Sequence, residues 1–109
     1  MALPTPVRVT KPPTVNVRNP VTASIGTAVA RWANNNPNRI ELHIVNLGTN
    51  NLFISPEPSV SSTRGILVGP SGGNASLLED EDGELVRIEW YGVAVVAAVD
   101  IYVLEVNLK

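Results

Sequence analysis

The amino-acid sequence predicts a small all-β domain, a β-sandwich or jelly roll of about eight short strands with an extended N-terminal arm. Short segments in which apolar and polar residues alternate recur along the chain, as expected for half-buried strands. Turn signals rich in Gly, Pro and Asn separate these segments at intervals of about 8–12 residues. A helix remains an alternative for residues 28–33 alone.

Length and composition are those of a single globular domain. The chain has 109 residues, of which 44% are hydrophobic and 17% charged, and this excludes disorder of the whole chain. The absence of cysteine excludes disulfides and thiolate metal sites. No apolar run has the length of a signal-peptide core or of a membrane span. We therefore expect folding in a cytoplasm and no contact with a membrane.

Residues 1–20 predict an extended arm, and residues 21–109 the β-sandwich body. Five prolines in the arm exclude a helix and interrupt any central strand. The arm carries three basic and no acidic residues (+3), whereas the body carries five basic and ten acidic residues (−5). The acidic body disfavours nucleic-acid binding. The charge split indicates an arm that seeks acidic protein surface, and a disordered tail or linker is the alternative. The residues expected to make the arm's contacts are Val7, Arg8, Val9, Lys11, Pro12, Pro13, Val15, Val17 and Arg18.

The first half of the body predicts three strands. Residues 21–33 are rich in small and β-branched residues and predict the first, and the asparagine-rich segment 34–38 is a turn. Residues 39–47 alternate, which predicts a half-buried strand. Its apolar face is expected to hold Ile40, Leu42 and Ile44, and its polar face Arg39, Glu41 and His43. The turn at 48–51 leads into a strand at 52–55, so these two strands predict a hairpin.

The second half of the body ends in unusually apolar strands. Residues 66–68 predict a short strand, and residues 85–91 predict another with Val86, Ile88 and Trp90 in the core. The segment 93–108 is apolar on both faces, whereas a strand of a sandwich has one core face. The second face needs a cover, and an interface between identical subunits is favoured over internal cover. The candidate interface residues are Val93, Val95, Val99, Ile101 and Val103.

Residues 79–84 (EDEDGE) form the densest charge cluster. Asp80 and Asp82 have calcium-binding chemistry, but the twelfth position from Asp80 holds Tyr91 instead of the Glu that an EF-hand requires. A solvated hairpin turn closed by Asp82-Gly83 is favoured. The cluster is also a candidate rim that receives a basic arm, through Glu79, Asp80, Glu81, Asp82 and Glu84.

No residue pattern indicates catalysis or a cofactor. His43 is the single histidine, whereas a metal site built on histidine usually needs a second His or Cys, so a surface or interface histidine is expected. The glycine-rich segment 69–76 lacks the Lys-Ser/Thr ending of a phosphate-binding loop. Ser71 and Ser76 are not expected to be nucleophiles, because only one histidine could serve as their base. We therefore expect no enzymatic activity, no cofactor and no metal.

Three segments resemble small virion proteins of tailed bacteriophages. In that family an N-R-x-x-L-x-I-x-N-x-G strand and turn precedes a glycine-rich segment of the form G-I-x-L-x-P-G-G, and a final strand ends near Glu. The first pattern is matched by Arg39, Leu42, Ile44, Asn46 and Gly48. The second is matched by Gly65, Ile66, Pro70, Gly72 and Gly73, with Ser71 interrupting the Pro-Gly-Gly. The likeness extends over residues 37–107.

The resemblance implies a capsid decoration (cement) protein or another small structural protein of the particle. Such proteins are commonly trimeric β-domains with an extended terminal arm. The implied partners are further copies of the chain, as a homotrimer, and the major capsid protein or another virion protein. The implied location is the capsid surface, after synthesis in the host cytoplasm. The alternative is a carbohydrate or cell-surface binding module of a phage tail fibre or spike, which predicts Tyr91 or Trp32 exposed in a groove.

Overall fold

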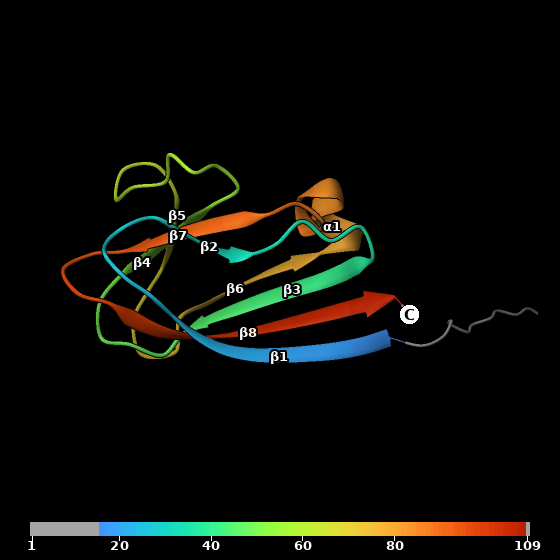
Figure 1. The fold of residues 1–109 in the computed structure, drawn as a ribbon, viewed down its shortest axis with the longest axis horizontal. Helices are drawn as coiled ribbons and strands as arrows, with labels where there is room; N and C mark the ends of the chain where they lie inside the picture. Colours follow the sequence, from blue (N-terminus) through green and yellow to red (C-terminus); the bar gives the residue numbers. More distant parts are fainter. Residues whose placement is uncertain (1–15, 109) are drawn as a thin grey trace, which may run out of the picture.

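A computed structural model describes residues 16–108 of the chain. Two antiparallel four-stranded sheets pack face to face, which confirms the predicted all-β sandwich (Figure 1). The first sheet has the order β1-β8-β3-β6 and the second sheet the order β2-β7-β4-β5. The strands are β1 (Asn16–Ile25), β2 (Ala30–Ala33), β3 (Arg39–Asn46), β4 (Leu52–Ser55), β5 (Ile66–Val68), β6 (Asn74–Leu78), β7 (Trp90–Ala94) and β8 (Val99–Leu108). Two short helical turns, α1 (Glu79–Asp82) and η1 (Gly83–Val86), follow β6.

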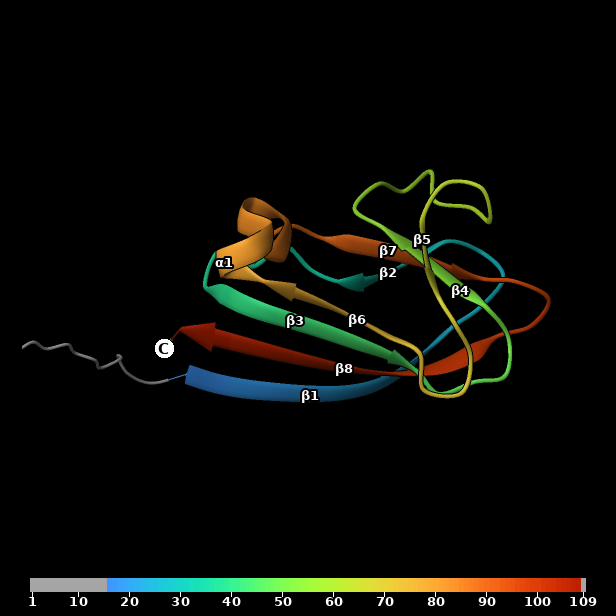
Figure 2. The same cartoon turned by 180° about the vertical axis from the view of Figure 1, so that it is seen from behind.

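The strand pairing is that of a jelly roll. β4 pairs with β5, β3 with β6, β2 with β7, and β1 with β8, all antiparallel. The chain is thus a long hairpin with its bend between β4 and β5, rolled so that successive pairs alternate between the two sheets. As the views from the two sides show, four connections gather at one end and the turns α1 and η1 lie at the other (Figures 1 and 2).

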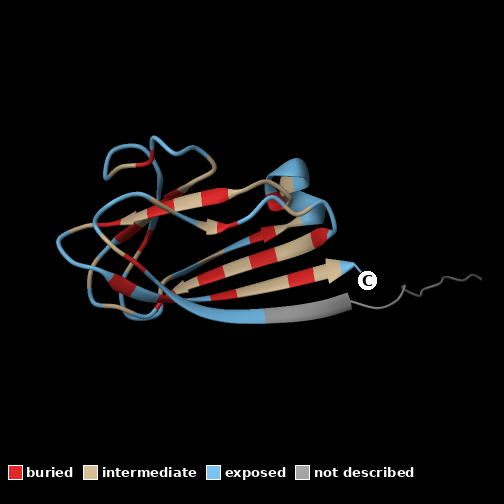
Figure 3. Ribbon diagram, in the orientation of Figure 1, coloured by how far each residue is buried: buried red, intermediate tan, exposed pale blue. Residues whose placement is uncertain are grey.

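The core lies between the sheets, where buried residues alternate with partly exposed ones along the central strands (Figure 3). The predicted core tryptophan, Trp90, is 1% exposed, and its Nε1 donates to the Leu85 carbonyl oxygen at 2.8 Å. Both the apolar ring and the polar N–H of this side chain are therefore satisfied. The core cluster comprises Ile25, Ala33, Leu42, Ile44, Leu52, Ile54, Val68, Leu77, Val86, Trp90, Ala94, Val99, Ile101 and Val103.

The predicted hairpin of residues 39–47 and 52–55 is wrong. β3 pairs with β6 and β8 in the first sheet, whereas β4 pairs with β5 and β7 in the second. The turn at 48–51 exists, but it carries the chain across from one sheet to the other. A turn signal in the sequence predicts that the chain changes direction, but it does not show with which strand the next strand pairs.

The strand predicted at residues 85–91 is also wrong in its first half. The acidic segment forms α1 and η1 in place of a hairpin turn, and β7 begins only at Trp90. Val86, the last residue of η1, still lies in the core and is 0% exposed. Residues 30–33 are strand β2, so the helical alternative for this segment is overturned.

Strand β1 begins before the expected start of the body at Val21. The backbone of residues 16–20 pairs with residues 104–108 of β8, and Pro20 is accommodated because β1 is an edge strand. The backbone of Val17 and Arg18 therefore belongs to a strand of the sheet. The remaining predicted arm residues lie outside the described part of the chain: Val7, Arg8, Val9, Lys11, Pro12, Pro13 and Val15.

The prediction that β8 supplies interface residues is also wrong. Val99, Ile101 and Val103 are 2%, 0% and 4% exposed and form part of the core, so they offer no surface to a second subunit. Val93 and Val95 are half-buried. The continuous strand expected at 93–99 is interrupted, because β7 ends at Ala94 and residues 95–98 form a loop before β8.

Candidate functional site

Arg39 is buried at the end of the molecule that carries α1 and η1, although alternation had placed it on a polar face. A β-bulge between Arg39 and Glu41 turns its side chain inward, where it is 0% exposed. Its guanidinium donates to Glu105 Oε2 at 2.8 Å and to three backbone carbonyl oxygens. Those carbonyls belong to Asn34, Val86 and Ile88, at 2.9, 2.6 and 2.6 Å. Arg39 therefore joins the turn after β2, the turn η1 and strand β8.

Asn46 is the buried polar side chain at the opposite end of β3. Its Nδ2 donates to the carbonyl oxygens of Asn50 and Val68 at 2.8 and 3.0 Å, and its Oδ1 accepts from the Gly48 N–H at 2.9 Å. Arg39 and Asn46 are the two buried polar side chains of residues 20–108, and both belong to the resembling motif. The motif thus marks the two positions at which β3 organises the neighbouring loops.

Four connections gather at the Asn46 end, and we call segments 26–29, 47–51, 69–73 and 95–98 the loop end (Figure 1). Backbone hydrogen bonds join them to each other and to the strands. Gly72 N and Ser71 N donate to the carbonyl oxygens of Asn46 and Gly48, each at 2.8 Å. Val95 N donates to Asn51 O at 3.0 Å. Segments 69–73 and 95–98 are thus both bonded to segment 47–51, whereas segment 26–29 is bonded to β7, where Ala94 N donates to Gly26 O at 2.8 Å.

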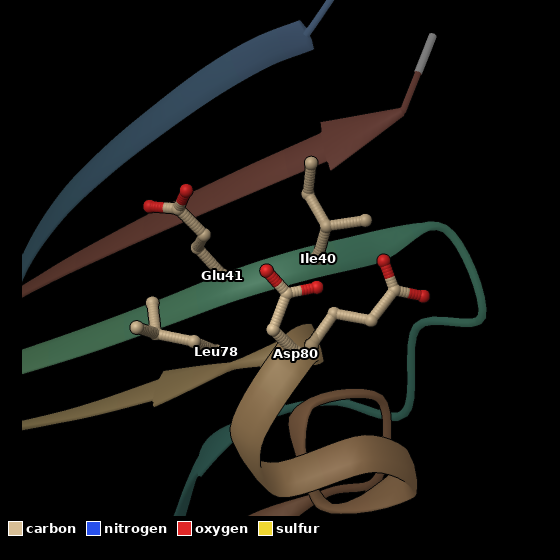
Figure 4. A pocket seen from close by; sticks show the side chains of 5 residues that line it. Ile40, Glu41, Leu78 and Asp80 are labelled. Carbon is tan, nitrogen blue, oxygen red and sulfur yellow. The ribbon is translucent and has the colours of Figure 1, made fainter.

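A small pocket lies beside the acidic turn at the other end (Figure 4). Its volume is about 180 Å³, and it is lined by Ile40, Glu41, Leu78, Glu79 and Asp80. Glu79 pairs with Arg87, and Asp82 Oδ2 accepts the Leu78 N–H at 2.8 Å. Two residues of the predicted acidic rim, Glu79 and Asp80, therefore line this pocket, and β3 supplies one further carboxylate, Glu41. No group of three or more metal-ligating side chains occurs within the described range.

His43 lies between Ser76 and Glu41 on the outer face of the first sheet. Its Nδ1 is 2.8 Å from Ser76 Oγ, and its Nε2 is 3.0 Å from Glu41 Oε1. A serine, an imidazole and a carboxylate in this order also make up a catalytic triad, but triad chemistry needs an enclosed site with donors for an oxyanion. His43 and Glu41 stand 27% and 43% exposed on a sheet face. They meet Ser76 because His43 and Ser76 are cross-strand partners, a register that the sequence does not reveal.

The two aromatic residues proposed for sugar binding are both held by the second sheet. Trp32 Nε1 donates to the Tyr91 carbonyl oxygen at 3.0 Å, and its ring packs on Trp90 with centroids 6.1 Å apart. The Tyr91 hydroxyl donates to Glu89 Oε2 at 2.9 Å, and Glu89 also pairs with Arg31. Both aromatic side chains are thus engaged within the sheet, and Tyr91 is half-buried.

The Glu89 contact gives a testable titration. The hydrogen bond to Glu89 raises the pKa of Tyr91 above its usual value, burial and the negative charge of Glu89 raise it further, and Arg31 opposes them. Glu89→Ala is therefore expected to lower the pKa of Tyr91. Tyr102→Phe leaves Tyr91 as the single tyrosine of the chain, so alkaline titration of phenolate absorbance measures it directly. Arg31→Met is the matched control and should shift the same pKa upward; a shift in the same direction for both variants would contradict the assignment.

The fold is thus a jelly-roll β-sandwich in which the central strand β3 carries two buried polar side chains, Arg39 and Asn46. The chain matches no protein-family model, and no curated protein or solved structure is significantly similar to it. No helix between residues 16 and 108 is long and apolar enough to cross a membrane.

Proposed function

We propose that the chain is a non-enzymatic structural protein that decorates and stabilises a bacteriophage capsid, through self-association of its body and through its N-terminal arm. The observation that carries the proposal is the position of β1. Among the strands of residues 16–108 it pairs only with β8, at the edge of the first sheet, and residues 20–24 are exposed. The start of β1 thus lies at a sheet edge, where a segment joined to it can contact a neighbouring protein.

The reach and charge of the N-terminal segment fit this role. Fifteen residues precede β1, and a fully extended chain of that length spans at most about 50 Å. It carries Arg8 and Lys11 with no acidic residue. Ordering 15 residues costs roughly 15–30 kcal/mol of backbone entropy, which prolines reduce because they restrict the free chain. Basic residues then steer the arm toward acidic protein surface.

The fold is compatible with the proposal by analogy. Jelly rolls occur in viral capsid domains, in lectins and in cupins, so the fold alone does not select a function. The resemblance of the Arg39–Gly48 and Gly65–Gly73 segments to small phage virion proteins selects the viral role among these. Trp32 packs its ring on Trp90, and both Trp32 and Tyr91 are half-buried, so the lectin-like alternative gains no support from a pair of fully exposed aromatic rings.

Deleting residues 2–15 tests the role of the arm. The deletion stops before Asn16, because residues 16–20 pair with β8 and their removal would damage the sheet. The truncated protein is expected to remain folded and self-associated. Its affinity for undecorated capsids of the phage that encodes it is expected to fall about tenfold or more. The measurement is the amount of protein pelleted with capsids at increasing protein concentration.

Charge reversal separates the arm's charge from its length. Arg8→Glu with Lys11→Glu is expected to weaken capsid binding and its salt dependence, whereas Thr5→Ala with Thr10→Ala should leave both unchanged. Capsid binding that is undiminished by the deletion would overturn the arm mechanism. A genome that encodes no capsid protein would overturn the viral role itself.

A further inference from the structure

We propose that the loop end is the surface through which copies of this chain associate, with Val29, Leu47 and Val96 as its apolar contacts. The inference rests on the proposed self-association and names the surface that performs it. These three residues are 42%, 52% and 83% exposed and come from three of the four connections at this end. Figure 3 shows these connections largely in the colour of exposed residues. They replace Val99, Ile101 and Val103, which are buried, as interface candidates.

The charge distribution favours a second copy of the chain as the partner that contacts the loop end. Segments 26–29, 47–51, 69–73 and 95–98 contain no charged residue, and the nearest carboxylate in sequence is Asp100 on β8. The opposite end carries the acidic turn with Glu79, Asp80, Glu81, Asp82 and Glu84. In a cyclic assembly the surface at the axis meets its own copies, so a charged surface there would face like charges. Because residues 21–109 sum to −5, the uncharged end is the surface best suited to self-contact.

Val96 is held in a conformation that its side chain disfavours. Its φ is 80°, and Ala97 N donates to Val95 O at 3.0 Å, which makes Val96 the central residue of a γ-turn with positive φ. This turn is rare and strained, and a β-branched residue at positive φ is an outlier. A glycine would occupy the position without strain. The chain nevertheless presents a large apolar side chain there, almost fully exposed, and strained backbone of this kind concentrates at functional positions.

The bracing of the loop end lowers the entropic cost of association. Ala94 N donates to Gly26 O at 2.8 Å, and Leu47 N donates to Asp100 O at 2.9 Å, so the apolar residues stand on connections fixed to strands. Gly48 permits the close approach, because a Cβ there would lie 2.7 Å from Val99 Cβ. A surface that is ordered before contact loses little conformational freedom on binding.

The test compares substitutions at equally exposed leucines. Leu47→Asp at the loop end is expected to weaken self-association about tenfold or more, measured by light scattering and sedimentation velocity over a concentration series. Leu67→Asp on β5 is the matched control, because Leu67 is 54% exposed and Leu47 52%. Leu67→Asp should leave the oligomer unchanged.

Val96→Gly separates loss of contact from loss of folding. It removes the apolar side chain and relieves the strained φ, so it should dissociate the oligomer while the melting temperature of the dissociated protein stays equal or rises. A wild-type chain that is monomeric at every concentration overturns the proposed self-association and this inference with it. An oligomer that survives both Leu47→Asp and Val96→Gly overturns the inference alone. Dissociation by Leu67→Asp alone assigns the interface to the outer face of the second sheet and also overturns it.

Discussion

Replacing Arg39 by methionine is expected to lower the free energy of unfolding by about 3–5 kcal/mol, a large effect for a single substitution. Methionine keeps the apolar stem but removes the guanidinium, which is 0% exposed and donates four hydrogen bonds. The carbonyl oxygens of Val86 and Ile88 lose a charged donor at 2.6 Å. The carboxylate of Glu105, 16% exposed, loses the guanidinium of Arg39 2.8 Å away.

Arg31→Met is the matched control for this prediction. Arg31 also pairs with a glutamate, but the pair is 3.2 Å apart and its side chains are 53% and 40% exposed. An exposed pair of this kind contributes about 0–1 kcal/mol. Chemical denaturation of both variants beside the wild type measures the difference, with the midpoint compared at equal slope. Equal midpoints for the two variants would show that burial of Arg39 adds nothing to its pair.

Glu105→Gln extends the same experiment to the other side chain of the ion pair. In the double variant with Arg39→Met, the side chain left behind is a neutral amide in place of a carboxylate. The double variant should therefore be more stable than Arg39→Met alone, and the coupling energy of the cycle measures the ion pair separately from the carbonyl hydrogen bonds. The pair lies at a strand end beside η1, so a loss confined to this end would appear first as faster hydrogen exchange of residues 83–86.

The bulge at Arg39 explains one error of the sequence analysis. Strict alternation through residues 39–44 places Arg39 on the polar face with Glu41 and His43, and it does so correctly for the latter two, which are partly exposed. The extra residue at the start of β3 turns Arg39 to the buried side, and Ile40, predicted on the apolar face, is only half-buried beside the acidic turn. Nothing in the sequence of this strand marks a bulge. The resemblance included Arg39 in its motif, which is a signal that the position matters but not that it is buried.

The strands were predictable because their signal is local, whereas their partners were not. Alternation identified β3 and the core position of Trp90, and turn residues located β4. The single strand predicted at 21–33 is wrong, because a loop at 26–29 separates β1 from β2. Pairing in a jelly roll joins β1 to β8 and β2 to β7, which are far apart in sequence, so the hairpin inferred between β3 and β4 failed. The short turns α1 and η1 were not predicted, because four residues are too few to show the periodic apolar pattern of a helix.

The exposed surface was the least predictable part. Val93 to Val99 looked like one apolar strand, because neither strain nor a γ-turn at Val96 leaves a mark in a run of valines and alanines. Glycine or asparagine would have signalled the turn. The apolar run also led to the choice of Val99, Ile101 and Val103 as interface residues, although these are buried and the most exposed apolar side chain of this segment is Val96, in the loop between β7 and β8.

Asn46→Asp is expected to lower the free energy of unfolding by about 3–5 kcal/mol at neutral pH with almost no change in side-chain shape. Asn46 is 0% exposed, and its Nδ2 donates to the carbonyl oxygens of Asn50 and Val68. A carboxylate cannot donate, so it would place a buried negative charge against two carbonyl oxygens. The Gly48 N–H, which now donates to Oδ1, remains its one partner among these contacts.

The pH dependence identifies the cause. An aspartate in this position is destabilised in its charged form, so the deficit relative to the wild type is largest at neutral pH and shrinks as the pH falls from about 7 toward about 4. Asn51→Asp, an exposed residue of the same loop, adds the same charge without burial and should cost little at any pH. Because Asn46 fixes the loop that carries Leu47, Asn46→Asp should also weaken self-association if the loop end is the interface. A deficit that does not change with pH would assign the loss to altered packing and remove the charge explanation.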